Sequence, residues 1–552
     1  MKAVRDAVID SLLEIGLLAS RADIQEVIYF RASRADISLR RRRGTLALPN
    51  VPVSIGPIRE VEVSGPYLNV VLNDEYLEEA VLQSIAREGP SFGFDSSLTG
   101  SRWVIEHTSI NPVYPINVAT FRSSVIGNAL AHSCVRRGAV VKTHFWVEDS
   151  SRHVKLVVDG LRAMNETVDS LAAMHGKTDH VIGAVFAAAL YKSRGRDQTF
   201  IDARLRQMFP RAHFVPSFGE ERAATRDANA GASVEVECRA ISDLCVRGFE
   251  GTFEAADISV DSYDVESEEC TGQVLHDVLQ RFNDRKDQGV DVGGLHETDL
   301  DPSSYLARNV AYYRARLEGG DRVVSVVSHR QRDLMGRVLL LLRILWPEMA
   351  GNLQIMFFGD VTIGEAGLDS VSNGVFHPVD DLVSEHAVAL GVTHKLIFAS
   401  LQFALLRSKA AKTCHLSGTV TTLHRPFIRI CLTLLKIRRI PISPRVSAAE
   451  PIRRDGAYRA LLKHIALLPD VLEDAAASIS YHRLAHYCIE MSNAADAYMR
   501  VTDGMLLDER LLSAADVALT NSIGAMGITI SSGDLAGVER LKRRRTMGAD
   551  HG

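Results

Sequence analysis

One segment indicates the architecture more clearly than any other: Glu106-His-Thr-Ser-Ile-Asn-Pro-Val-Tyr-Pro-Ile-Asn-Val-Ala-Thr-Phe-Arg-Ser-Ser-Val-Ile-Gly127. An apolar run, Arg102-Trp-Val-Ile-Glu106, leads into it and is typical of a short strand. A turn with prolines follows, and then a helical pattern from about Thr120 to Arg137 that Gly138 closes. The next strand is expected at Val140 to Glu148. Strand, turn, helix and strand in this order predict a parallel βαβ unit.

A second βαβ unit is expected further along the chain. Its strands are Arg322 to Ser328 and Leu353 to Phe358, and its helix runs from about Arg332 to Leu345. The intervening residues, about 160–300, have a weaker pattern and are expected to form an inserted domain. A parallel sheet of this kind binds ligands at the carboxyl ends of its strands.

The two ends of the chain have different patterns. Residues 1–100 mix helical spacing with strand alternation, which predicts an α+β domain. From about Lys395 onward the pattern is helical, with apolar residues three and four apart, and it predicts a helical bundle over 396–552. The clearest helical patterns there are Gly456–Ser478, Tyr481–Val501 and Glu509–Met526.

Composition limits the classes of function. A chain of 552 residues is too long for one core, so two to four domains are expected. The net charge of −5 gives no global attraction to nucleic acid, so any RNA contact requires local basic patches. Two arginine-rich runs are candidates for contacts with RNA phosphates: Arg40, Arg41, Arg42 and Arg43 near the N-terminus, and Lys542 to Arg545 near the C-terminus. A solvated surface is the alternative interpretation of both.

Several features favour a cytoplasmic location. The longest apolar run, Val338 to Trp346, is interrupted by Arg343 and is too short to span a membrane. The seven cysteines have no Cys-x-x-Cys pair, which is typical of reduced thiols in a cytosolic protein. Cys414, His415 and His424 lack the spacing of a zinc site, so no metal site is predicted.

The segment Glu106–Gly127 resembles the nucleotide-binding turn of arginyl-tRNA synthetases, which are class I aminoacyl-tRNA synthetases. In that family the middle of the turn reads His-x-Gly-His, and both imidazoles contact ATP phosphates. Here the same positions are Asn117, Val118, Ala119 and Thr120. Other segments resemble the family in the same order along the chain: Pro57–Phe94, Trp146–Arg152, Asp179–Gly183, Tyr481–Tyr487 and Gly524–Ile528.

The resemblance implies a mixed α/β fold with three parts. Residues 101–395 would form a class I synthetase-type Rossmann nucleotide-binding domain that contains the inserted domain. Residues 1–100 would form the appended α+β domain that contacts tRNA in the family. Residues 396–552 would form an all-α bundle of the anticodon-binding type.

The resemblance also implies an arginine pocket made by Glu106, Asn111, Tyr305, Asn309 and Gln331. Asn309 stands where the family has Asp, so the charge-assisted bidentate pairing with a guanidinium is missing. The alternative is that these residues are leftover polar groups with local partners.

The second ATP motif of the family is a lysine-containing loop. The corresponding segment here includes Gly367, Leu368, Asp369 and Ser370, and no Lys or Arg lies between Arg343 and Lys395. This loop cannot supply a cation to a pyrophosphate, although class I activation depends on such groups. Compensating groups would have to come from elsewhere, and the candidates nearby in sequence are His107, His132, Lys142 and His144.

These features predict an arginyl-tRNA synthetase-like protein that has lost amino-acid activation and acts by binding tRNA, a related RNA or a protein partner. The alternative is a divergent but active arginine–tRNA ligase, and ATP and Mg²⁺ are expected as cofactors only in that case. A third hypothesis is a sensor of an arginine-like ligand. The sequence leaves open whether the protein is a monomer or a homodimer.

Overall fold

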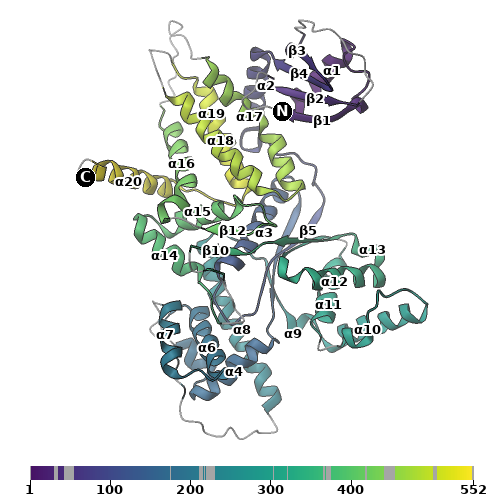
Figure 1. Ribbon diagram of the computed structural model, residues 1–552, viewed down its shortest axis with the longest axis vertical. Coiled ribbons are helices and arrows are strands. Elements are labelled where there is room, and N and C mark those ends of the chain that lie inside the picture. Colours follow the sequence, from purple (N-terminus) through teal and green to yellow (C-terminus); the bar gives the residue numbers. More distant parts are fainter. Residues whose placement is uncertain are drawn as a thin grey trace. The chain divides into compact units, whose positions relative to one another are not determined.

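Figure 1 shows the computed structural model of the protein. The chain divides into two compact units. Unit 1 comprises Met1–Ser96 and Arg425–Met526, and unit 2 comprises Ser97–His424 and Gly527–Gly552. Each unit combines two segments that are distant in sequence. This division does not test the predicted domain limits 1–100, 101–395 and 396–552, which stay predictions. The described residues are 2–29, 35–42, 55–173, 176–209, 216, 218, 230–301, 304–319, 321–364, 367–368, 374–416, 419–440, 454–500 and 506–549.

The core of unit 2 is a five-stranded parallel sheet with the strand order β7-β6-β5-β8-β9. Both predicted βαβ units are confirmed, with α3 (Val118–Arg136) and α12 (Arg332–Leu345) as their helices. The inner strands are buried almost throughout, as a parallel sheet requires. The strands are β5 (Arg102–Ile110), β6 (Val140–Val147), β7 (Ser262–Val265), β8 (Arg322–Ser328) and β9 (Leu353–Phe358).

Helix α3 packs closely on β5 because Gly127 has no side chain. A Cβ atom added to Gly127 would lie 2.1 Å from the Cβ atom of His107, which is too close for any other residue. The helix begins at a side-chain cap, in which the Asn117 Oδ1 atom accepts a hydrogen bond from the Thr120 amide at 2.8 Å. The quoted segment therefore places the start of α3 at the carboxyl end of β5.

A small three-stranded sheet follows β9. Its order is β11-β10-β12, with β10 (Val361–Ile363) antiparallel to β11 (Gly367–Leu368) and parallel to β12 (Cys414–Leu416). Strand β12 corrects the sequence-based expectation of helices alone beyond residue 395. Its three residues alternate in burial, and β10 supplies a partner from a part of the chain that no local pattern reveals.

The guanidinium group of Arg122 joins these elements. Arg122 lies on α3 with no exposed surface and donates to the main-chain carbonyl oxygens of Gly359 (2.8 Å), Asp360 (3.2 Å), Lys412 (2.8 Å) and Lys409 (3.1 Å). Burial lowers the pKa of Arg122 from its ordinary value. A cation on one helix therefore satisfies four carbonyl groups in two loops that flank β10.

The remaining helices of unit 2 surround this core. The described residues between β6 and β8 are mostly helical, and the C-terminal segment forms α20 (Ser532–Ala549). No single helix among the described residues is long and apolar enough to cross a membrane, and the bent pair α14 and α15 meets those criteria only when taken together. The helices are α4 (Arg152–Met164), α5 (Val168–Ala173), α6 (Thr178–Ser193), α7 (Gln198–Met208), α8 (Ala230–Ala255), α9 (Glu266–Glu269), α10 (Gly272–Asp287), α11 (Tyr305–Leu317), α13 (Pro347–Ala350), α14 (Val379–Leu390) and α15 (His394–Leu406).

Unit 1 combines an antiparallel sheet with helices from both ends of the chain. The sheet order is β1-β2-β4-β3, and β4 alternates buried and half-buried residues. The strands are β1 (Ile24–Tyr29), β2 (Ile37–Arg41), β3 (Ile58–Ser64) and β4 (Tyr67–Leu72). The helices are α1 (Lys2–Glu14), α2 (Asp74–Glu88), α17 (Gly456–Ala477), α18 (Tyr481–Met499) and α19 (Glu509–Ala525), and α16 (Val420–Arg438) crosses the division between the units.

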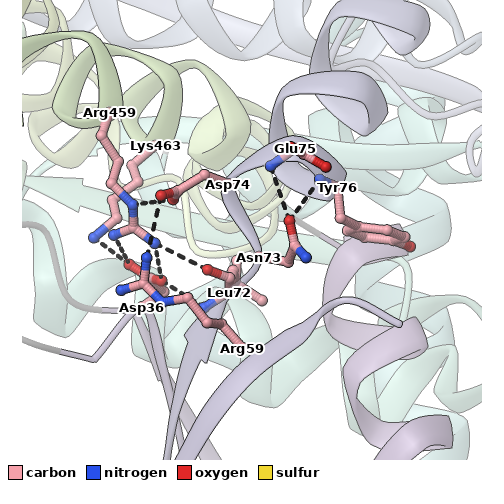
Figure 2. Close-up of polar contacts among 9 residues, drawn as sticks. All are labelled: Asp36, Arg59, Leu72, Asn73, Asp74, Glu75, Tyr76, Arg459 and Lys463. Atoms are coloured by element: carbon pink, nitrogen blue, oxygen red, sulfur yellow. Dashed lines mark hydrogen bonds and ion pairs between the residues drawn. The ribbon is translucent and has the colours of Figure 1, made fainter. Parts of the chain in front are cut away.

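A buried carboxylate links the sheet of unit 1 to α17. Figure 2 shows the side chains of Arg459 and Lys463 extending from α17 on the same side of Asp36 to its carboxyl group. Arg459 binds both oxygens of Asp36, at 3.1 and 2.8 Å, and Lys463 is a further ion-pair partner. The Leu72 amide also donates to Asp36, at 2.7 Å.

The charged form of Asp36 is stabilised in this cluster. Burial raises its pKa, but the hydrogen bonds from Arg459, Lys463 and Leu72 outweigh burial, so the pKa is lowered. Because the folded-state pKa lies below the unfolded one, the cluster stabilises unit 1 above the ordinary pKa of aspartate and loses that effect as the pH falls through the lowered value.

We expect Asp36→Ala to lower the free energy of unfolding by about 3 kcal/mol, because it removes the buried carboxylate that two partly buried cations and the Leu72 amide share, although Arg459 keeps its contacts with Asp74 and the Leu72 carbonyl oxygen. Urea unfolding followed by circular dichroism measures the change, and hydrogen exchange at the Leu72 amide reports it locally. The matched control is Asp474→Ala. Asp474 pairs with Arg483 at the surface of the same unit, with 47% and 60% of the two side chains exposed, and its loss should cost less than about 1 kcal/mol. Equal effects of the two variants would contradict this assignment.

Candidate functional site

Unit 2 contains a cavity of about 280 Å³ at the carboxyl ends of its parallel strands. Residues of β5, β6, β8 and β9 line it, together with the first turns of α3 and one face of α11. This is where a sheet of this topology is expected to bind a ligand. Among the residues singled out from the sequence, those that line the cavity are Glu106, Asn117, Ala119, Thr120, Tyr305, Asn309 and Gln331.

Glu106 lies on β5 and is 4% exposed. A single oxygen of its carboxyl group, Oε2, accepts hydrogen bonds from the Tyr313 hydroxyl at 3.0 Å and from the Ser325 hydroxyl at 2.7 Å. Burial raises the pKa of Glu106 to about 7, although these two bonds oppose the shift. Sequence analysis missed Tyr313 and Ser325, whose periodic apolar surroundings on α11 and β8 give no sign of a polar role.

Tyr305 and Asn309 lie one turn apart on α11, as their spacing predicts. The Tyr305 hydroxyl donates to the Glu148 carboxyl group at 2.5 Å, and the Asn309 side-chain amide donates to the Tyr305 carbonyl oxygen at 2.8 Å. Burial raises the pKa of Glu148, which follows β6, to about 7. Glu148 was not a predicted site residue, although it lies in the segment Trp146–Arg152 that carries part of the resemblance, at a position where the family has Asn.

The two remaining residues of the expected pocket differ in placement. Gln331 ends a short 3₁₀ helix after β8 and lines the cavity. Asn111 directly follows β5 but does not line the cavity, because the chain turns there toward Pro112. The Oδ1 atom of Asn111 is buried and accepts no hydrogen bond within the part of the chain that the structure describes.

The first motif is occupied by structural contacts. The Asn117 side chain caps α3 and is 3% exposed, and Val118 is completely buried and does not line the cavity. Ala119 and Thr120 line the cavity but carry no group that can hold a positive charge. At this end of the cavity, the motif residues cap helix α3 and pack in its core, and none of them carries an imidazole.

The second motif is only partly described. Gly367 and Leu368 form β11, which pairs with β10. Asp369 and Ser370 lie outside the described residues, so the expected negative charge at Asp369 stays a prediction.

A cation missed by sequence analysis lies at the rim of the cavity. Arg330 lines the cavity, and its Nε atom is 3.0 Å from one carboxyl oxygen of Asp360. His329 pairs with the other oxygen of Asp360 at 3.2 Å. Arg330 follows β8 and Asp360 follows β9, so the adjacency of these two parallel strands brings the charges together. The position of Arg330 directly before Gln331 was the available signal.

The four compensating candidates do not line the cavity. His107 is completely buried, contacts Thr108 and the Ser259 carbonyl oxygen, and has a pKa lowered by burial to about 4. His144 pairs with Asp264 at 2.6 Å, and burial lowers the pKa of His132. Lys142 is exposed near the start of β6, far along the strand from its carboxyl end.

The arginine run near the N-terminus is divided by strand alternation. On β2, Arg40 is exposed and lies 3.8 Å from Glu26, whereas Arg41 is 5% exposed. The buried position of Arg41 corrects its place among the RNA-contact candidates, because successive side chains of a strand point to opposite faces. Arg42 is exposed, and Arg43 lies outside the described residues.

One cluster of described residues has the geometry of a metal site, but a lysine occupies it. Asp179, His180 and Asp380 bring their ligand atoms within 4.8 Å of one another. The Lys177 ammonium lies 3.1 Å from Asp179 and 2.8 Å from Asp380. These contacts hold the pKa of Asp380 down to about 2 and tie α6 to the start of α14. We therefore interpret the cluster as an internal ion-pair network.

Curated proteins include relatives that match most of this chain. No family model matches it. Among curated proteins it is similar to the arginine–tRNA ligase of Methanothrix thermoacetophila, with 24% identity over 93% of both chains, and to that of Methanosphaerula palustris, with 24% identity over 85% of this chain and 86% of the relative.

Solved structures agree in fold. The arginyl-tRNA synthetase of Thermus thermophilus matches 96% of this chain and 99% of its own with a TM-score of 0.68 at 15% identity. That of Plasmodium falciparum matches 95% and 98% with a TM-score of 0.64 at 13% identity. Together with the parallel sheet, the cavity at its carboxyl edge and the helical segment Arg425–Met526, these similarities show that the chain resembles arginyl-tRNA synthetases over nearly its whole length and has their class I fold.

Proposed function

We propose that the protein binds an arginine-like cationic ligand and tRNA without activating the amino acid. The observation that carries this proposal is the contrast between the two ends of one cavity. The inner end has carboxylate, tyrosine and amide groups at Glu106, Tyr305 and Asn309. The end beside α3 has Asn117, Ala119 and Thr120, where the family has two imidazoles.

The absence of these groups should strongly lower the rate of amino-acid activation. Activation develops charge on transferred phosphates, and preorganised cations and donors stabilise that charge. Removing one such donor typically lowers the rate by about a hundred- to a thousandfold. Two imidazoles and the lysines of the second loop are absent from this sequence, so the losses together would exceed a useful turnover.

We expect no arginine-dependent exchange of pyrophosphate into ATP, with or without tRNA, because the α3 end of the cavity holds no imidazole. An active arginyl-tRNA synthetase assayed in parallel is the positive control. Exchange clearly above the enzyme-free rate that disappears in Glu106→Gln would contradict the proposal, since Glu106 is the buried acid of the pocket.

A second candidate is a divergent but active arginine–tRNA ligase. Two observations favour it: the curated relatives are arginine–tRNA ligases, one of them matched over 93% of both chains, and Arg330 supplies a cation at the rim. An arginine at this place could contact a triphosphate if it exchanged Asp360 for the phosphate.

If exchange is found, the second candidate predicts that Arg330→Ala lowers its rate by about a hundredfold, the cost of one lost preorganised donor. Arg332→Ala is the matched control, because Arg332 stacks 4.6 Å from the centre of the Phe357 ring and does not line the cavity. Equal rates for Arg330→Ala and the unchanged protein would remove Arg330 from this role.

The proposed RNA contact rests on Arg40 and Arg42, which are exposed in unit 1. Each phosphate contact contributes to affinity and to its dependence on salt. We expect salt-sensitive tRNA binding that the double change Arg40→Ala and Arg42→Ala weakens, with a salt slope reduced by about 2. Asn117→Ala should leave this binding intact. Filter binding at low salt measures it, and the lack of a complex at about 50 µM protein would exclude the RNA role, because non-specific binding is already detectable there.

A further inference from the structure

Two buried carboxyl groups lie near the cavity in unit 2: Glu106 lines it, and Glu148 lies behind Tyr305, which lines it. Glu106 is 4% exposed on β5, and Glu148 is 9% exposed just after the neighbouring strand β6. The Tyr305 side chain connects Glu148 to the cavity, since Tyr305 lines the cavity and its hydroxyl lies 2.5 Å from Glu148. The charges of the two carboxyl groups influence each other.

Both carboxyl groups have neutral hydrogen-bond partners. Glu106 accepts from two hydroxyl groups on Tyr313 and Ser325, and Glu148 accepts from the Tyr305 hydroxyl. Two nearby acids differ in this respect, because Asp264 pairs with Arg316 at 2.6 Å and Glu266 pairs with Arg308 at 2.6 Å. Buried carboxylates without a paired cation are costly, so they take up a proton or a positive ligand.

The electrostatic surroundings agree with the geometry. Around Glu106, burial and Asp264 of β7 disfavour the charge, whereas Ser325, Tyr313 and His144 favour it, and the pKa rises to about 7. Around Glu148, burial, Glu266 of α9 and Glu106 disfavour the charge, whereas Tyr305 and Arg308 of α11 favour it, with the same result.

We propose that Glu148 is a specificity-determining residue that, together with Glu106, forms a two-carboxylate site for a guanidinium or ammonium group, and that this cation displaces a proton from the pair on binding. This inference rests on the proposed ligand-binding function. The exchange is balanced, because a carboxylic acid loses a proton to the solvent while the ligand brings the compensating positive charge. Asn309 cannot supply a carboxylate, and Glu148 supplies one from the other side of Tyr305.

The sign of the pH effect follows from this exchange. A cation favours the ionised carboxyl groups, so binding should tighten as the pH rises through 7. At pH 7 each carboxyl group with a pKa near 7 would release about half a proton, and affinity would rise by up to about tenfold per pH unit for each full proton released. A neutral ligand of the same shape would show neither effect.

Calorimetric titration of the full-length protein tests the proposal. L-arginine and its neutral isostere L-citrulline are titrated at pH 6, 7 and 8 in buffers with different heats of ionisation, which gives the number of protons released. We expect proton release and increasing affinity with pH for arginine, and a pH-independent, weaker interaction for citrulline. Arginine binding without proton exchange at all three pH values would overturn this inference and leave the proposed binding function intact. No binding of either ligand would overturn both.

Variants assign the effect to Glu148. Glu148→Gln should release about half as many protons as the unchanged protein and bind arginine about 10- to 100-fold more weakly, as expected for one lost charged hydrogen bond. Tyr305→Phe keeps the carboxyl group but removes its donor, so proton release should move to higher pH. The control is Glu268→Gln, an acid on α9 with 67% of its side chain exposed, which should change neither quantity. An unaltered proton count in Glu148→Gln at an unchanged melting temperature would exclude Glu148 from the site.

Discussion

The guanidinium group of Arg122 fixes the wall of the cavity that faces α3. It lies without exposed surface and binds main-chain carbonyl oxygens in two loops, at Gly359, Asp360, Lys409 and Lys412. A hydrogen bond from a charged donor contributes about 1.5–3 kcal/mol, and a buried carbonyl without a partner costs about as much. Arg122 on α3 therefore helps to position Asp360, whose side chain pairs with Arg330 and His329. The geometry of the rim depends on a cation that never contacts the cavity itself.

Strand and helix positions could be predicted wherever the pattern is local. The two βαβ units and the three long C-terminal helices follow from periodicity. The short strand Cys414–Leu416 and the burial of Arg41 could not be predicted, because both depend on partners distant in sequence. The same holds for the site. Glu106 and Tyr305 stand in recognisable patterns, whereas Glu148 and Arg330 acquire their roles only when neighbouring parallel strands bring their ends together.

Negative charge has been redistributed in the pocket rather than removed. The resemblance places Asp at the position of Asn309 and Asn at the position of Glu148, so this chain exchanges the two kinds of group across Tyr305. An acid at position 309 would lie on α11, whereas Glu148 follows the strand β6. The charges of Glu266 and Arg308 influence the ionisation of Glu148. Under the proposed function, the pocket keeps an acid for a cationic ligand, while Asn117, Ala119 and Thr120 at the α3 end are neutral. The proposal attributes ligand binding to the first feature and the loss of activation to the second.

The cluster around Asp36 has a consequence for the order of events during protein synthesis. Asp36 and its partner Arg459 are 423 positions apart in the chain. At about 5–20 residues per second, a ribosome needs roughly 20–85 s to make the intervening segment. The whole parallel sheet of unit 2 emerges within that interval, and its strands can pair with neighbours already made. The sheet of unit 1 is therefore made before that of unit 2 and obtains its contacts with α17 only after it. Until Arg459 and Lys463 are made, the Asp36 carboxylate has neither of these two cations as a partner.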